Sequence, residues 1–206
     1  EYKIYRKTVT AEAIQASGFT AAVSDTDNKL LKEIQKDIKS DLFGFVTGTA
    51  GVTTATGTSF QSAVGKTLGQ LAVKWEDDDI QSVLFVNPLD FYDYLGGQQL
   101  TIQTVFGMQY LQGFMGFNTV IISAMIPQGK MFATAVNNLN LAYANVNGNL
   151  STAFNFTADE TGLVGITHNS VNDSLVYQSV IMDGMKLFPE RLDGIIATTI
   201  QPTASK

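Results

Sequence analysis

The strongest hydrophobic pattern along the chain is that of two amphipathic helices. In residues 25–43, apolar side chains recur every four positions, and lysines and acidic residues occupy the positions between them. Ser24 or Asp25 can cap this helix at its N-terminus. Residues 60–75 show a similar spacing and predict a second helix. The apolar faces contain Leu30, Ile34, Ile38 and Leu42 in the first helix, and Phe60, Val64, Leu68, Leu71 and Trp75 in the second.

Strands are predicted where apolar residues alternate with polar ones or form short runs. Asn87 and Pro88 follow one such run and favour a short helix that Gly96 closes. Residues 126–129 are predicted to form a turn, with proline at the second position and glycine at the fourth. The predicted strands are residues 2–10, 82–86, 118–124, 130–136, 151–157 and 163–168.

Residues 177–200 are the most informative segment of the chain. They contain two strand-like runs joined by a polar corner at residues 188–191, and no side chains in a catalytic arrangement. Residues 44–59 are rich in Gly and Thr, and we expect them to form a mobile loop between domains. A sequence whose strongest signature is strands and a corner favours a structural role.

Composition excludes several classes of function. The chain has no cysteine, so disulfides, thiolate metal sites and cysteine nucleophiles are excluded. A net charge of −6 argues against tight binding to nucleic-acid phosphates, which requires clustered Lys and Arg. No apolar run approaches the roughly 20 residues that span a bilayer, and we expect no signal peptide. The 206 residues can form one large domain or two small ones.

Two motifs resemble parts of active sites but lack the rest of them. Gly65-Lys66-Thr67 resembles the end of a phosphate-binding loop, but Phe60 stands where that loop needs glycine, and the motif falls inside a helix. His168 is the only histidine, and triads and zinc sites need a histidine with defined partners. We therefore predict a surface lysine at position 66 and a polar loop or strand-end histidine at position 168.

The acidic residues show no catalytic or metal-binding pattern either. The run at residues 76–79 lacks the alternating oxygen ligands and the glycine of a calcium loop, so a solvated helix end is predicted. Asp90 and Asp93 are interpreted as ordinary acids in the first turns of a short helix. We therefore predict no catalytic residue, no cofactor and no metal.

Four aromatic residues form a cluster in the sequence: Phe106, Tyr110, Phe114 and Phe117. Such a cluster could stack against single-stranded bases. Because no basic groove accompanies it, packing in the core or against another subunit is the favoured interpretation.

Three parts of the chain, taken together and in order, resemble the major capsid proteins of tailed bacteriophages, which have the Hong Kong 97-like shell fold. The first part is similar to that family's strand, long spine helix and glycine loop. The second is similar to a strand, Asn-Pro, helix unit followed by a strand, Pro-x-Gly, strand unit. The third is similar to a long strand, an Arg-bearing corner and a return strand. These parts are residues 8–17 with helix 25–43 and Gly48, residues 82–96 with 116–136, and residues 177–200.

The resemblance implies an α+β fold with two domains. In the peripheral domain a long helix lies on a long β-sheet, and in the axial domain helices flank a central sheet. The first run of 177–200 should lie in the peripheral sheet, and the second should return to the axial domain. The implied boundaries are residues 1–46 for the peripheral domain, with spine helix 25–43, 47–150 for the axial domain, 151–190 for further peripheral strands, and 191–206 for the return strand.

The resemblance also implies an N-terminally truncated member of that family. Such proteins normally have an N-terminal arm and an extended loop before the spine helix. The chain begins with Glu1 instead of Met, and only about 20 residues precede Asp25. We therefore expect a processed or trimmed chain.

The implied function is that of a non-catalytic structural subunit of a phage or prophage icosahedral capsid. Such a subunit self-assembles into hexamers and pentamers that enclose double-stranded DNA without sequence-specific binding. Scaffolding, protease and portal proteins are the implied partners. The implied location is the virion capsid, and the host bacterial cytoplasm before assembly; no membrane is involved.

Three alternatives remain open. The first is an encapsulin-like compartment shell with a protein cargo. The second is a non-catalytic, β-rich binding or adhesion domain, suggested by the Thr, Asn and Gly content, which requires a mostly β protein without the helix at 25–43. The third is a hydrolase that uses Asp90 or Asp93, for which the sequence indicates no substrate.

The implied fold makes residues 188–191 a crossing point between two domains. Glu190 and Arg191 are therefore the candidates for ion pairs between subunits or domains. Phe114 and Phe117 are the corresponding aromatic candidates for subunit or interdomain contacts.

Overall fold

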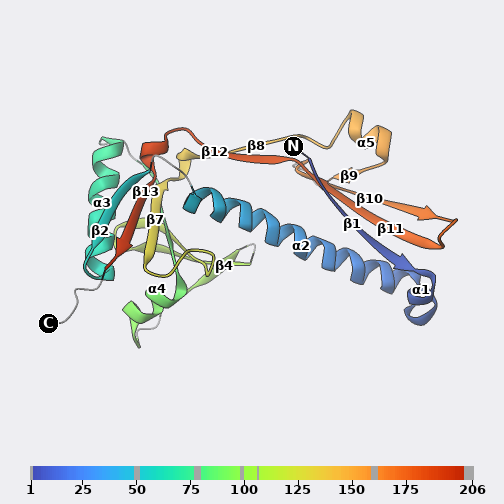
Figure 1. Cartoon of the computed structure of the whole chain (residues 1–206), viewed down its shortest axis with the longest axis horizontal. Coiled ribbons are helices and arrows are strands. Elements are labelled where there is room, and N and C mark those ends of the chain that lie inside the picture. The colour runs from blue at the N-terminus through green and yellow to red at the C-terminus, as the bar shows by residue number, and fades with distance from the viewer. Residues whose placement is uncertain are drawn as a thin grey trace. The chain divides into compact units, whose positions relative to one another are not determined.

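The computed structural model describes residues 2–48, 52–76, 80–97, 100–105, 107–158 and 162–201. The chain divides into two compact units, whose elements are labelled in Figure 1. Unit 1 consists of Glu1–Lys39 and Leu141–Leu187, and unit 2 consists of Ser40–Asn140 and Phe188–Lys206. The domain boundaries at residues 47, 151 and 191 that the resemblance implied stay a prediction.

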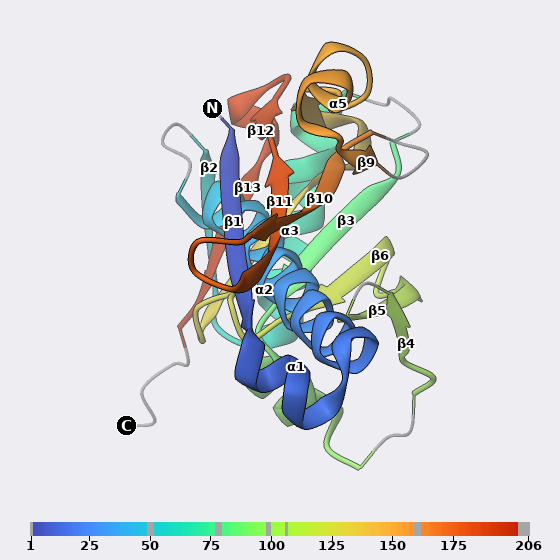
Figure 2. The same ribbon diagram turned by 90° about the vertical axis from the view of Figure 1, so that its right-hand side faces the viewer.

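Unit 1 is built on a four-stranded antiparallel sheet with the order β1, β11, β10, β9. Figure 2 shows the long strands beside one another with α2 along them. Successive side chains of each strand alternate between the two faces of the sheet. The strands are β1 (Lys3–Thr10), β11 (Val176–Asp183), β10 (Val164–Val171) and β9 (Thr157–Ala158).

The core of unit 1 lies between this sheet and the helix α2 (Phe19–Gly48). Leu30 and Ile34 of the helix and Ile181 of β11 are at most 2% exposed. Leu30 and Ile34 are among the apolar helix positions that the sequence pattern predicted. The solvated and buried faces of this part of α2 are therefore as predicted. The helix α1 (Ala11–Ser17) links β1 to α2.

Helix α2 is longer at both ends than the predicted helix 25–43. Gly18, with φ +82°, separates α1 from α2, and Phe19 packs edge-on against Tyr177 with ring centroids 4.9 Å apart. At the other end, Phe43 and Val46 are buried in the core of unit 2. Packing at both ends therefore extends the helix beyond its predicted caps. A helix of 30 residues also contradicts the mostly β architecture of the binding-domain alternative.

Unit 2 contains a seven-stranded mixed sheet with the order β2, β13, β7, β3, β6, β5, β4. The central strand β3 runs parallel to β6 and antiparallel to β7. The strands are β2 (Thr53–Gly57), β13 (Ile196–Ile200), β7 (Lys130–Ala135), β3 (Ser82–Val86), β6 (Phe117–Ile122), β5 (Met108–Phe114) and β4 (Gln103–Val105).

Both faces of the unit 2 sheet are covered, which explains why β3 is a continuous apolar run. Leu84 and Val86 pack with residues of α3 (Phe60–Trp75) and α4 (Pro88–Leu95). Val83 and Phe85 point to the other face, where they pack with Phe43 and Val46 of α2.

The described parts of residues 44–59 are not the loop that the sequence predicted, and residues 49–51 lie outside the described residues. Residues 44–48 continue α2, and Thr53–Gly57 form the edge strand β2, which pairs in parallel with β13. At Gly57 the backbone passes so close to α3 that a Cβ atom would lie 2.3 Å from the Ala63 nitrogen. The glycine thus serves close packing here and not mobility.

The predicted strand at 151–157 is also wrong, because residues Asn149–Phe154 form the helix α5. The Ser151 hydroxyl accepts a hydrogen bond from the Gly148 nitrogen at 3.1 Å and donates one to the Gly148 carbonyl at 2.8 Å. This local capping outweighs the strand preference of the Thr and Phe residues. Only Thr157–Ala158 of the predicted strand is extended, as β9.

The turn after β6 lies one residue later than predicted. The Lys130 nitrogen donates to the Pro127 carbonyl at 3.2 Å, so the turn spans Pro127 to Lys130 with Gly129 at its third position. Gly129 has φ +74°, and a third position with positive φ is the place where a type II turn requires glycine. After the turn, β7 pairs with one edge of β3, while β6 pairs with the other edge.

The segment 177–200 contains three strands where the sequence predicted two runs and a corner. β11 ends at Asp183 and β12 (Met185–Pro189) follows, in a two-stranded sheet with β8 (Leu139–Tyr143). The short 3₁₀ turns η1 (Val136–Asn138) and η2 (Leu192–Gly194) precede β8 and β13. The corner is thus followed by a tight turn before the chain enters the unit 2 sheet.

Candidate functional site

The predicted corner is fixed to unit 2 through the main chain of Arg191. The Asn138 side chain accepts a hydrogen bond from the Arg191 nitrogen at 2.7 Å and donates one to the Arg191 carbonyl at 2.9 Å. Asn138 is fully buried, and its amide also donates to the Thr134 hydroxyl at 2.9 Å. One buried amide therefore satisfies both polar groups of the Arg191 backbone.

The guanidinium of Arg191 also has partners within unit 2. It lies 5.3 Å from the centroid of the Trp75 ring, and its Nη2 is 3.6 Å from Asp193 Oδ2. Lys74 Nζ contacts the same carboxylate at 3.3 Å. The hydrogen bond from Lys74, together with the nearby charge of Arg191, holds the pKa of the Asp193 carboxyl below its ordinary value of 3.8.

The turn η2 leaves no room for a side chain at Gly194. A Cβ atom there would lie 2.8 Å from Trp75 Cζ2. The Gly194 carbonyl accepts hydrogen bonds from the Thr134 hydroxyl at 2.9 Å and from Trp75 Nε1 at 3.3 Å. Sequence reasoning missed Trp75, Asn138 and Gly194 as parts of this corner, since they are far apart in the chain.

Of the four predicted contact residues, Glu190 is the most available to a partner. It is exposed, and no hydrogen bond or ion pair joins it to any residue that the structure describes. The Arg191 side chain is 45% exposed despite its contacts.

Of the aromatic candidates, Phe114 is half-buried, with its ring centroid 5.3 Å from that of Phe91. Phe117 is 1% exposed and belongs to the core of unit 2. Tyr110 is half-buried, and Phe106 lies outside the described residues.

The sequence predicted that His168 lies in a loop or at a strand end, and this prediction is wrong. His168 lies within β10, and its Nε2 is 2.9 Å from Asp27 Oδ2 of α2. Ser179 is its cross-strand partner on β11. Ser179 is fully buried, and its Oγ has no hydrogen-bond partner among the described residues. The three residues therefore lack the accessible, hydrogen-bonded serine that a nucleophilic triad needs.

The other candidate side chains have structural roles. Lys66 lies inside α3 and donates to the Thr56 carbonyl at 2.6 Å, while Thr67 is buried and hydrogen-bonded to Thr198 at 2.7 Å. Asp90 Oδ2 accepts a hydrogen bond from the Gly129 nitrogen at 2.7 Å, and so fixes the turn before β7. Asp93 is exposed.

The acidic run that follows α3 is described only in part. Glu76 ends α3 in a left-handed conformation, and residues 77–79 of the acidic run lie outside the described part of the chain. Among the described residues, no group of three or more His, Asp or Glu side chains could hold a metal ion. No helix in the described ranges is both long and apolar enough to cross a membrane.

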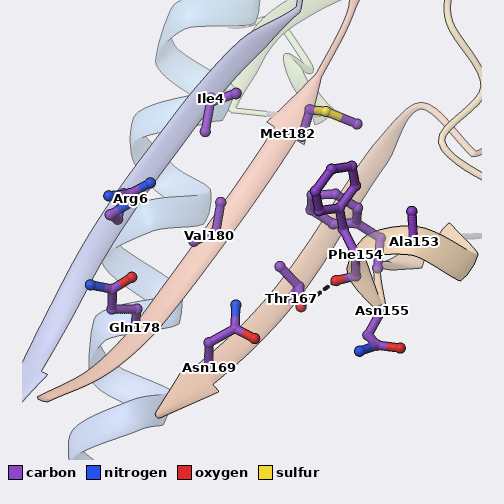
Figure 3. A pocket seen from close by; sticks show the side chains of 11 residues that line it. Ile4, Arg6, Ala153, Phe154, Asn155, Thr167, Asn169, Gln178, Val180 and Met182 are labelled. Carbon is purple, nitrogen blue, oxygen red and sulfur yellow. Dashed lines mark hydrogen bonds between the residues drawn. The ribbon is translucent and has the colours of Figure 1, made fainter. Parts of the chain in front are cut away.

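An apolar groove of unit 1 lies on the face of its sheet opposite the α2 core (Figure 3). It has a volume of about 400 Å³. Ile4, Val180 and Met182 form an apolar floor, and Phe154 of α5 stands beside it. The Thr167 hydroxyl donates to the Phe154 carbonyl at 3.0 Å, which fixes the end of α5 to β10. No pair of acid and base side chains lines this groove.

The sequence has no match among protein-family models or among curated proteins. Solved structures do match it. The holo-SrpI encapsulin complex from Synechococcus elongatus PCC 7942 has a TM-score of 0.66 at 11% identity, over 100% of this chain and 77% of that one. A structure from Mycobacterium phage Che8 matches with a TM-score of 0.63 at 11% identity, over 96% of this chain and 70% of that one.

A virus-like particle from Pyrococcus furiosus matches as well, with a TM-score of 0.57 at 10% identity over 96% of this chain and 76% of that one. Identities this low show the fold alone. They confirm the α+β architecture that the sequence predicted, over nearly the whole chain.

Proposed function

Because the chain has the Hong Kong 97-like shell fold, we propose that it is a structural subunit of a phage or prophage capsid. In this proposal many copies assemble into hexamers and pentamers that close an icosahedral shell around double-stranded DNA. The observation that carries the proposal is the likeness to a virus-like particle, an encapsulin and a phage structure over 96–100% of the chain.

The side chains support a non-catalytic role. Three of the candidates for chemistry are used by the fold: Lys66 and Asp90 hold backbone groups, and His168 pairs with a helix. A net charge of −6 suits a protein that encloses DNA without adhering to it. Scaffolding, protease and portal proteins are proposed as further partners, with the virion capsid as the location after assembly in the host cytoplasm.

Glu190, Arg191 and Phe114 are the proposed contact residues. Glu190 and Arg191 follow β12 at the exposed corner, where Asn138 fixes the backbone and leaves the Glu190 carboxylate accessible. A charge on a fixed backbone forms an ion pair with a partner at a smaller entropic cost than a charge on a flexible one. Phe117, also predicted as a contact, is proposed to act only through the core that supports Phe114.

Electron microscopy of the protein in its full length tests the proposal. Expressed in bacteria and purified by size, the protein should give closed particles or hexameric rings in negative stain. Monomers at all protein concentrations and salt conditions would contradict the proposal.

An encapsulin-like compartment is the second candidate, since an encapsulin aligns with 100% of this chain at a TM-score of 0.66. The contents of the particles distinguish the two. A capsid produced in its host should contain double-stranded DNA, detected by nuclease-protected absorbance at 260 nm. A compartment should instead contain one co-purifying protein in a fixed ratio and no protected DNA.

A further inference from the structure

The only histidine of the chain joins the long helix of unit 1 to the sheet beneath it. His168 Nε2 of β10 lies 2.9 Å from Asp27 Oδ2 of α2, and the two side chains are 30% and 21% exposed. The residues are 141 positions apart in the sequence, so the contact depends on the fold.

The imidazole is also held on its other side. Its ring stacks on Tyr177 of β11, with centroids 5.8 Å apart and planes inclined by 17°. Tyr177 in turn meets Phe19, at the start of α2, edge-on at 4.9 Å. The ring therefore has a fixed orientation toward Asp27.

A second ion pair fastens α2 on the opposite side of β11. Lys7 Nζ of β1 lies 2.8 Å from Glu33 Oε2 of the helix. Lys7 and His168 are both cross-strand partners of Ser179, so they flank the same position of the central strand. The helix is thus tied to β1 by Lys7–Glu33 and to β10 by His168–Asp27.

The two ion pairs join different kinds of ionisable group. Histidine gains and loses its proton between about pH 5 and pH 8, whereas lysine and glutamate ordinarily keep their charges over this range. Among the described contacts, the groups that meet His168 are Asp27 from α2 and Tyr177 and Ser179 from β11. Lys7 and Glu33 are paired with each other. Asp27 is therefore the charged partner of the imidazole.

We propose that the His168–Asp27 contact makes the docking of α2 on the unit 1 sheet pH-dependent. The imidazolium forms an ion pair with Asp27, and the neutral ring forms only a hydrogen bond. Asp27 Oδ1 is buried without a hydrogen-bond partner among the described residues, so the carboxylate depends on His168 for compensation. In this proposal the charged form of the contact holds α2 on the sheet more strongly than the neutral form does.

A pair of double-mutant cycles on the full chain tests this proposal. The first cycle combines His168→Gln with Asp27→Asn, and the matched cycle combines Lys7→Gln with Glu33→Gln. Unfolding in urea is measured at pH 5.5 and pH 8.0 for each variant. For the first cycle we expect a coupling of about fivefold in the unfolding equilibrium constant at pH 5.5 and below about twofold at pH 8.0.

The matched cycle should give the same coupling at both pH values. A His168–Asp27 coupling that is equal at the two pH values, or absent at pH 5.5, would overturn the proposal. Should a variant fail to fold, hydrogen exchange of the unaltered chain, corrected for intrinsic rates, replaces the cycle. Residues 20–31 must then be better protected at pH 5.5 than at pH 8.0, and equal protection rejects the proposal. Neither measurement requires a shell, so the outcome is independent of the proposed function.

Discussion

Asn138 and Arg191, 53 positions apart, are joined by two hydrogen bonds between the Asn138 side-chain amide and the Arg191 backbone. The Arg191 nitrogen donates one at 2.7 Å, and the Arg191 carbonyl accepts the other at 2.9 Å. This pairing places the end of η1 against the corner that precedes β13. Because Asn138 is fully buried, its amide groups have no water to replace these partners. The pairing therefore anchors the last strand of the chain to unit 2.

Asn138→Ala should lower the free energy of unfolding by about 2 kcal/mol, because it removes the partner of the Arg191 nitrogen. The Arg191 carbonyl keeps its hydrogen bond from the Gly194 nitrogen at 3.3 Å. Urea unfolding followed by circular dichroism gives this value. Asn140→Ala is the control, since the Asn140 amide makes only a 3.4 Å hydrogen bond to the Asn137 carbonyl. The control should change stability by less than about 0.5 kcal/mol, and equal losses in the two variants would count against the anchor.

Gly57→Ala should destabilise the protein by about 2 kcal/mol, because the new methyl group would lie 2.3 Å from the Ala63 nitrogen. Gly69→Ala is the matched variant on the adjacent helix α3, where nothing lies within 4 Å of a Cβ atom. This variant should stabilise the helix by about 0.5–1 kcal/mol. Thermal unfolding of both variants checks the close approach of β2 to α3. Similar melting temperatures for the two variants would refute this close approach.

Asp193→Asn should destabilise the protein at pH 7 and have little effect in acid. The Lys74 hydrogen bond holds the pKa of Asp193 below 3.8 in the folded state. A depressed pKa means that the stabilisation is fully present above pH 4 and is lost as the pH falls through the folded-state pKa. Urea midpoints of both proteins should therefore differ at pH 7 and converge toward pH 3. A difference that persists unchanged at pH 3 would exclude this ionic contribution.

Glu190→Arg should impair assembly without changing the fold. Glu190 has no partner among the described residues, so reversing its charge leaves the chain's own contacts intact while opposing a cation on a neighbour. Sedimentation velocity should show fewer particles than for the unaltered protein, with an unchanged far-ultraviolet circular dichroism spectrum. Asp173→Arg, at an exposed position of unit 1, is the matched charge reversal. Normal assembly of Glu190→Arg would remove Glu190 from the proposed contacts.

Local signals were sufficient to predict some elements from the sequence. Asn87 caps α4 by accepting from the Leu89 nitrogen at 2.8 Å, Pro88 is its first residue, and Gly96 ends it. All of this information lies within ten positions. The four-residue spacing of Leu30, Ile34 and Ile38 likewise identified the buried face of α2, because one helix face meets one sheet.

The sequence did not predict the elements that depend on partners far away along the chain. β2 exists because it pairs with β13 at the other end of the chain, and Gly57 is needed there because α3 approaches it. The same holds for the candidate sites: His168 finds Asp27, and Arg191 finds Asn138 and Trp75, only after folding. The sequence identified the exposed corner at Glu190 and Arg191, but not the side chains that fix it.

A cryo-electron microscopy reconstruction of particles formed by the full-length protein tests the central claim most directly. The proposed function predicts a closed icosahedral shell in which every lattice position contains the long helix α2 and the seven-stranded sheet of unit 2. A protein that remains monomeric under all assembly conditions, or forms particles without icosahedral symmetry, would contradict it.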